Sequence, residues 1–97
     1  MIDLKPADLA LLKAILQQQL PLAKVWAFGS RVSGQAKPYS DLDLAIDAAA
    51  ALPEQTRITL LDVLQNSNLP FRVDIVDWHQ TTEVFKAIIE QQRVALY

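Results

Sequence analysis

The chain has 97 residues, of which 52% are hydrophobic, and a formal net charge of −2. This length predicts a single domain over residues 1–97, and the hydrophobic share predicts a folded chain. The negative charge argues against direct binding to nucleic acid, and the absence of cysteine excludes disulfides and thiolate metal sites. No apolar run reaches the ~18 residues that span a membrane, and the first residues lack the apolar segment of a secretory signal. These features predict a cytoplasmic protein without a membrane partner.

The first half of the chain predicts one helix and two strands. A helix is expected over residues 6–20, ended by Pro21, with one buried stripe at helical spacing: Leu9, Leu12, Ile15 and Leu16. The apolar run at 25–28 predicts a first strand, in which Trp26 and Phe28 share a face. Residues 29–40 predict a loop with a short helical turn from Ser30, and residues 42–47 predict a second strand.

The second half predicts a helix, a strand and a last helix. The middle helix begins near Pro53, and its predicted apolar face is Ile58, Leu61 and Leu64. A third strand is expected over 71–76. Thr81 or Thr82 caps the last helix, whose predicted stripe is Val84, Phe85, Ile88 and Ile89. Because one face of the second and third strands is apolar and the other carries acids, we expect an α+β fold: a mixed sheet of three to four strands, with helices packed on one face and the other face open.

Acidic side chains alternate with apolar ones on the second and third strands. Asp41 and Asp43 are two residues apart and therefore project to the same face, and Asp74 joins them if the two strands are neighbours. Neighbouring carboxylates repel each other and favour a cation. The Gly29-Ser30 turn offers backbone N–H groups and a hydroxyl that suit phosphate oxygens. The pattern predicts a divalent metal beside a triphosphate; alternatively, the acids are solvent-facing residues of an edge strand.

Two runs at this spacing resemble a known enzyme superfamily. The run FGSR at 28–31, followed by SDLDLA at 40–45, resembles the DNA polymerase β nucleotidyltransferase superfamily. The short length and the run VDIVD at 73–77 resemble its minimal nucleotidyltransferases (MNT), the antitoxins of HEPN toxin pairs. The resemblance implies a nucleotidyltransferase fold and an enzyme that transfers AMP from ATP to a tyrosine of a partner HEPN toxin, thereby silencing it.

The resemblance also implies roles for individual residues. Gly29 and Ser30 would bind the β- and γ-phosphates, and Arg31, beside the turn, is a candidate phosphate clamp. Asp41, Asp43 and Asp74 would be the catalytic acids and would hold two divalent metals, most naturally Mg²⁺. Asp74 would complete the second metal site and help deprotonate the attacking hydroxyl.

Two other functions are compatible with the same sequence. The chain could neutralise its toxin by binding alone, without catalysis, or it could transfer a nucleotide to a small molecule in a pocket that the partner supplies. Larger relatives carry a second domain for the acceptor, so the resemblance implies that the HEPN partner provides the acceptor surface here. The sequence leaves the nucleotide base and the oligomeric state open, including a homo-oligomer.

Overall fold

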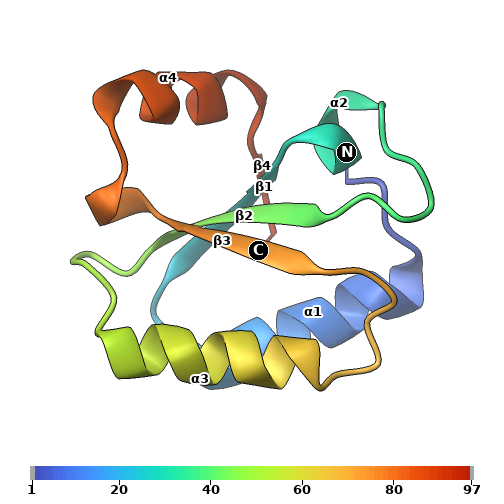
Figure 1. The fold of residues 1–97 in the computed structure, drawn as a ribbon, viewed down its shortest axis with the longest axis horizontal. Coiled ribbons are helices and arrows are strands. Elements are labelled where there is room, and N and C mark those ends of the chain that lie inside the picture. Colours follow the sequence, from blue (N-terminus) through green and yellow to red (C-terminus); the bar gives the residue numbers. More distant parts are fainter. Residues whose placement is uncertain (1, 97) are drawn as a thin grey trace.

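A computed structural model describes residues 2–96, which form a four-stranded mixed sheet with helices on both sides (Figure 1). In chain order the elements are α1 (Pro6–Gln19), β1 (Lys24–Phe28), α2 (Ser30–Ser33), β2 (Leu42–Asp47), α3 (Glu54–Gln65), β3 (Val73–Asp77), the 3₁₀ helix η1 (Trp78–Gln80), α4 (Glu83–Gln92) and β4 (Val94–Ala95). The predicted α+β class is confirmed. None of the helices in residues 2–96 is long and apolar enough to cross a membrane.

The strand order is β3-β2-β1-β4, with β2 parallel to β3 and β1 antiparallel to both of its neighbours. The parallel pairing aligns Asp43 with Asp74, and the antiparallel pairing aligns Phe28 with Asp43. The two strands that carry the acids are therefore neighbours, as the predicted acid cluster requires. Strand β4 was not predicted, because its two residues are defined only by their pairing with Trp26 and Ala27.

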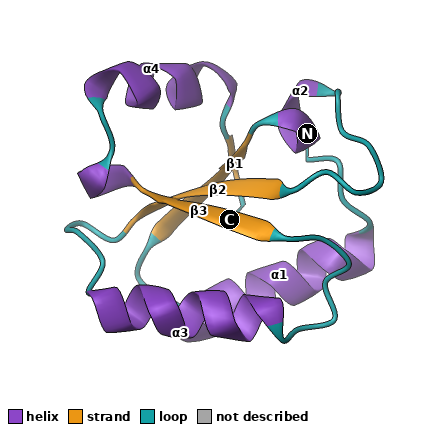
Figure 2. Ribbon diagram, in the orientation of Figure 1, coloured by secondary structure: helices purple, strands orange, loops and turns teal. Residues whose placement is uncertain are grey.

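Helices α1 and α3 cover one face of the sheet, below the strands in Figure 2. The main core lies between them and the sheet, and its fully buried members include Leu12, Leu16, Leu44, Ile46 and Leu60. In the predicted stripe of α1, Leu12, Ile15 and Leu16 are buried, and Leu9 is partly buried against the core. The predicted face of α3 is wrong at Ile58, which is 52% exposed; Leu60 is buried in its place. Apolar residues lie on several sides of α3. The spacing of these residues therefore does not decide which of them are buried, and the contacts of α3 with the rest of the fold do.

Helix α4 covers part of the opposite face of the sheet, which is thus less open than the sequence predicts. The buried residues of this second cluster are Phe28, Ala45 and Ile89, and the ring of Phe85 meets that of Phe28 edge-on at 5.9 Å. The predicted stripe of α4 holds for Phe85 and Ile89, whereas Val84 and Ile88 are exposed. Trp26 and Phe28 make this face of β1 apolar, and helix α4 shields them from solvent.

Candidate active site

Three carboxylates, those of Asp41, Asp43 and Asp74, lie near the start of β2 and β3 and are called the acid row below. Asp43 and Asp74 are paired residues of the two strands, and Asp41 directly precedes β2. Burial is the main cause that raises the pKa of Asp43, and the charges of Asp74 and Asp41 raise it further, while Arg72 lowers it. Burial and two neighbouring negative charges make the ionised form of Asp43 unfavourable, and a nearby cation would relieve this cost.

Arg72 is the cation that the chain itself places beside this acid row. Its Nη2 lies 2.8 Å from Oδ2 of Asp41, and its Nε lies 3.5 Å from Oδ1 of Asp74. The side chain is 73% exposed, so it is held by these charges and not by packing. Within residues 2–96, no three acidic, histidine or cysteine side chains stand together as a metal-binding group. The three carboxylates nevertheless supply the hard oxygen atoms that Mg²⁺ prefers.

The Gly29-Ser30 turn is in direct contact with the acid row. Gly29 has φ 82° and ψ −156°, a backbone conformation that favours glycine. A Cβ atom at this position would collide with Oδ2 of Asp43. The carbonyl of Gly29 accepts hydrogen bonds from the N–H groups of Val32 and Ser33, each at 3.0 Å, and so starts helix α2. The structure thus brings together the predicted phosphate turn and the predicted metal ligands.

The guanidinium of Arg31 is bound to other parts of the chain, so the structure gives no support to its predicted role as a phosphate clamp, which stays a prediction. The residue is only 7% exposed. Its Nε, Nη1 and Nη2 atoms donate to the backbone carbonyls of Ser40, Asp3 and Pro38, at 3.0, 2.9 and 3.3 Å. The guanidinium also lies 4.4 Å from the ring centre of Phe71. These contacts fasten the 38–40 loop and the N-terminal segment, so Arg31 is a structural residue.

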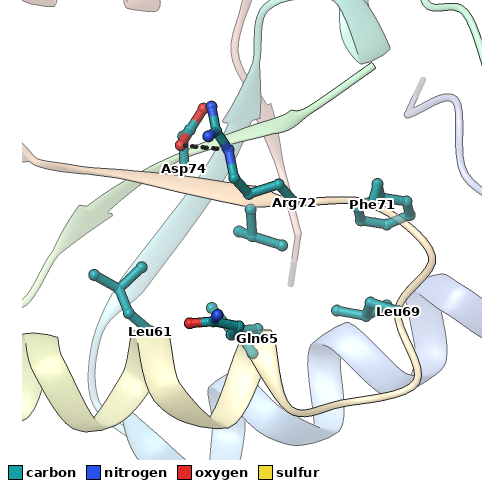
Figure 3. A pocket seen from close by; sticks show the side chains of 8 residues that line it. Leu61, Gln65, Leu69, Phe71, Arg72 and Asp74 are labelled. Atoms are coloured by element: carbon teal, nitrogen blue, oxygen red, sulfur yellow. Dashed lines mark ion pairs between the residues drawn. The ribbon is translucent and has the colours of Figure 1, made fainter. Parts of the chain in front are cut away.

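A pocket of about 390 Å³ lies beside the acid row, between α3 and the outer edge of β3 (Figure 3). Its wall is mostly apolar, with Arg72 and Asp74 at one side; it is lined by Leu61, Leu64, Gln65, Leu69, Phe71, Arg72, Val73 and Asp74. In Figure 3, Asp74 and Arg72 point to the face of β3 opposite to α3. The pocket is thus adjacent to Asp74, but the carboxylate of Asp74 does not point into it.

The family model described as polymerase beta nucleotidyltransferase matches residues 11–97. The chain belongs to this nucleotidyltransferase family. It is 48% identical, over 95 residues, to a probable protein adenylyltransferase MntA of Haemophilus influenzae; the match covers 98% of this chain and 83% of the relative.

Solved structures support the same assignment of this nucleotidyltransferase. A crystal structure of a toxin–antitoxin with AMP-PNP matches with a TM-score of 0.79 and 28% identity, over 92% of this chain and 72% of that one. A structure of a tri-AMPylated HEPN toxin of Shewanella oneidensis in complex with an MNT antitoxin matches with a TM-score of 0.71 and 26% identity, over 94% of this chain and 70% of that one. The expected resemblance to MNT antitoxins is confirmed.

Two residues at the site were not among the predicted site residues. Arg72 is two residues before Asp74, and residues two apart along a strand point to the same face. The alternation of the third strand therefore could have predicted that Arg72 lies beside the acids. Gln92 accepts a hydrogen bond from the N–H of Gly29 at 2.9 Å, from the far end of α4. A glutamine at a helix end carries no sequence signal for such a contact, because only the tertiary fold brings it to the turn.

Proposed function

We propose that this nucleotidyltransferase transfers AMP from ATP to a tyrosine of a HEPN toxin, with Mg²⁺ as the metal, and acts as an antitoxin. The proposal is supported by the 48% identity to a probable protein adenylyltransferase and by the likeness to toxin–antitoxin structures that contain AMP-PNP or an AMPylated HEPN toxin. The observation that carries it is the contact of the Gly29-Ser30 turn with Asp43, in register with Asp74.

The side chains of the site divide the chemistry between them. The Ser30 hydroxyl and the N–H groups that open α2 bind the triphosphate, and Asp41, Asp43 and Asp74 would hold the metal. Asp74 accepts the proton of the attacking tyrosine hydroxyl. The tyrosine oxygen forms a bond to the α-phosphorus of ATP, and the bond from that phosphorus to the bridging oxygen breaks, so that pyrophosphate leaves.

Mg²⁺ would supply charge neutralisation on the phosphates and lower the pKa of the attacking hydroxyl. The carboxylates fit such an ion by their chemistry, since hard oxygen ligands and a repelling pair of acids both favour it. For Asp41 and Asp74 to hold it, the side chain of Arg72 would have to turn away from them. Because that side chain is 73% exposed and its ion pairs are at the surface, its displacement would cost little.

The proposal is tested with a HEPN protein, for which the product of the adjacent open reading frame is the first candidate. The purified chain, ATP and Mg²⁺ are incubated with that protein, and intact-mass spectrometry measures AMP groups added to it. We expect added AMP with the parent chain and none with Asp41→Asn. Asp47→Asn, a carboxylate removed from the same strand outside the acid row, is the matched control and should transfer AMP as the parent does.

The same experiment separates the other two functions. A HEPN protein that stays unmodified but co-elutes with this chain in size-exclusion chromatography would indicate a binding antitoxin without catalysis. Nucleotide consumption without modification of the partner would indicate a small-molecule acceptor. Ser30→Ala serves as a second site variant: it should slow transfer and leave stability nearly unchanged, because the Ser30 side chain caps no helix in this structure.

A further inference from the structure

The first N–H of the phosphate turn is bound by a side chain from the opposite end of the chain. Gly29 N–H donates to Oε1 of Gln92 at 2.9 Å, across 63 residues of sequence, in a partly buried place. We propose that Gln92 is a positioning residue of the nucleotide site: it fixes the orientation of the Gly29 peptide, so that the N–H groups of Ser30 and Arg31 face the phosphates. This inference rests on the proposed function.

Packing on both sides of Gln92 fixes its place relative to the turn. Ile89, one turn earlier on α4, is fully buried in the cluster that contains Phe28, the residue before the turn. Arg93, the next residue, stacks its guanidinium over the ring of Trp26 at 4.3 Å. Strand β4 then pairs with β1, the strand that leads into the turn. The end of α4 and the start of the turn are therefore held together as one packed unit.

The turn needs such a contact because glycine does not fix its own peptide orientation. Gly29 has access to more backbone conformations than any residue with a side chain. Asp43 packs against its α carbon, and Gln92 binds its N–H, so the two contacts select one conformation. The N–H groups of Ser30 and Arg31 come next, at the start of α2, where a helix offers them no carbonyl partner. They are the donors left for a phosphate.

A neutral amide suits this role better than the alternatives. A carboxylate at position 92 would also accept the Gly29 N–H, but would place a negative charge beside a polyanion. An apolar side chain would leave the Gly29 N–H without its partner. The glutamine oxygen orients the turn without competing for the phosphate and without repelling it.

Two variants separate orientation from charge. Gln92→Met keeps a long unbranched side chain and removes the acceptor, whereas Gln92→Glu keeps the acceptor and adds a charge. Gln91→Met, at the exposed neighbouring position, is the matched control. The measurements are the ATP dissociation constant with Mg²⁺ at low and high salt, the KM and kcat for ATP, and the position of the Gly29 amide signal in ¹⁵N–¹H spectra.

We expect Gln92→Met to weaken ATP binding about tenfold at both salt concentrations, the effect of one well-placed hydrogen bond. KM should rise more than kcat falls, and the Gly29 amide signal should move. Gln92→Glu should leave the Gly29 amide signal in the range of a hydrogen-bonded amide. It should weaken ATP binding at low salt, and this loss of affinity should be smaller at high salt because the added charge is screened. Gln91→Met should match the parent throughout.

Equal ATP affinity of the parent and Gln92→Met would overturn the inference. If Gln92→Met does not fold, Gln92→Glu decides: ATP affinity equal to the parent's at low salt would place Gln92 away from the phosphates and overturn it. A parent chain that binds no ATP would instead overturn the proposed function, so the parent's own binding isotherm tells the two failures apart.

Discussion

The carboxylate of Asp43 lies against the α carbon of Gly29, in the space that a side chain at position 29 would occupy. The contact joins the end of β1 to the start of β2, and therefore the phosphate turn to the acid row. The two halves of the proposed site are thus built against each other, and a change in one half is expected to disturb the other.

Gly29→Ala is expected to destabilise the chain by about 2 kcal/mol and to abolish ATP binding. The positive φ strains any residue with a Cβ, at a cost of about 1–3 kcal/mol. The new methyl group also pushes against the Asp43 carboxylate. Denaturant unfolding and calorimetric titration with ATP measure the two effects.

Gly34→Ala is the matched control for this prediction. Gly34 has nearly the same φ, 83°, but its ψ of 11° lies in the αL region, where alanine is strained less than at Gly29, and nothing lies within 4 Å of a Cβ placed there. Gly34→Ala should lower the free energy of unfolding by the backbone strain alone, about 1–2 kcal/mol, and should leave ATP binding unchanged. Equal costs and equal ATP affinities for the two alanine variants would contradict the steric role of Asp43.

Arg31→Met is expected to lower the free energy of unfolding by about 2–3 kcal/mol, because three hydrogen bonds from a buried cation to backbone carbonyls are lost. ATP affinity of the folded fraction should change little. Urea unfolding checks the first effect and titration with ATP the second. Lys37→Met, an exposed cation in the neighbouring loop, should change stability by less than about 0.5 kcal/mol. A large loss of ATP affinity without a loss of stability would support the phosphate-clamp role.

The elements that sequence predicts best are those with a strict local pattern. The alternation at 42–47 gives β2 with its observed bounds, and the parity of Asp41 and Asp43 gives the acid row. Pro6 at the first position of α1 and Pro21 after its end set the limits of this helix to within a residue. Such signals are local, since side-chain direction and proline geometry depend on a few neighbouring residues.

The features that the sequence does not reveal depend on contacts between distant segments. Strand β4 exists only through its pairing with β1, and the exposure of Val84 and Ile88 follows from how α4 sits on the sheet. Arg31 adjoins the phosphate turn in sequence, which suggests a ligand contact. Its burial under the 38–40 loop is decided by the fold alone.

The Asp47–His79 contact predicts a stability that falls in acid. His79 Nε2 lies 2.6 Å from Oδ1 of Asp47, and this hydrogen bond, followed by the one from the Ala49 N–H, lowers the pKa of Asp47 below its ordinary 3.8. The charged carboxylate therefore stabilises the fold above pH 3.8, and this contribution is lost as the pH falls through the lower, folded-state pKa.

Asp47→Asn should accordingly reduce stability at pH 7, by less than about 1 kcal/mol because the pair is partly exposed, and the difference from the parent should disappear well below pH 3.8. Unfolding curves of both chains from pH 7 downward give this difference. His79→Gln combined with Asp47→Asn in a double-mutant cycle isolates the pair. A difference that does not change with pH would show that the shape of Asp47, and not its charge, matters.

Asp43→Asn should have the opposite dependence on pH. The pKa of Asp43 is raised, so between pH 3.8 and the folded-state pKa the native chain binds more protons than the unfolded one, and stability falls as the pH rises through that window. At pH 7 the Asp43 charge therefore destabilises the metal-free chain. Removing it should leave the variant as stable as the parent or more stable, and below pH 3.8 the two should be equal.

In the presence of Mg²⁺ and ATP, the parent should become more stable than Asp43→Asn. A ligand that binds only the native state raises its melting temperature by mass action, so the parent should gain stability from Mg²⁺-ATP. Asp43→Asn lacks the anionic oxygen that would hold the proposed metal and should gain little, while AMP transfer should fall by orders of magnitude. Thermal unfolding of both chains with and without Mg²⁺-ATP, at pH 7, measures the effect, and Asp47→Asn should respond to Mg²⁺-ATP as the parent does. An Asp43→Asn chain that is unfolded without metal would make Asp43 a structural hydrogen-bonding residue and would refute the metal role of β2.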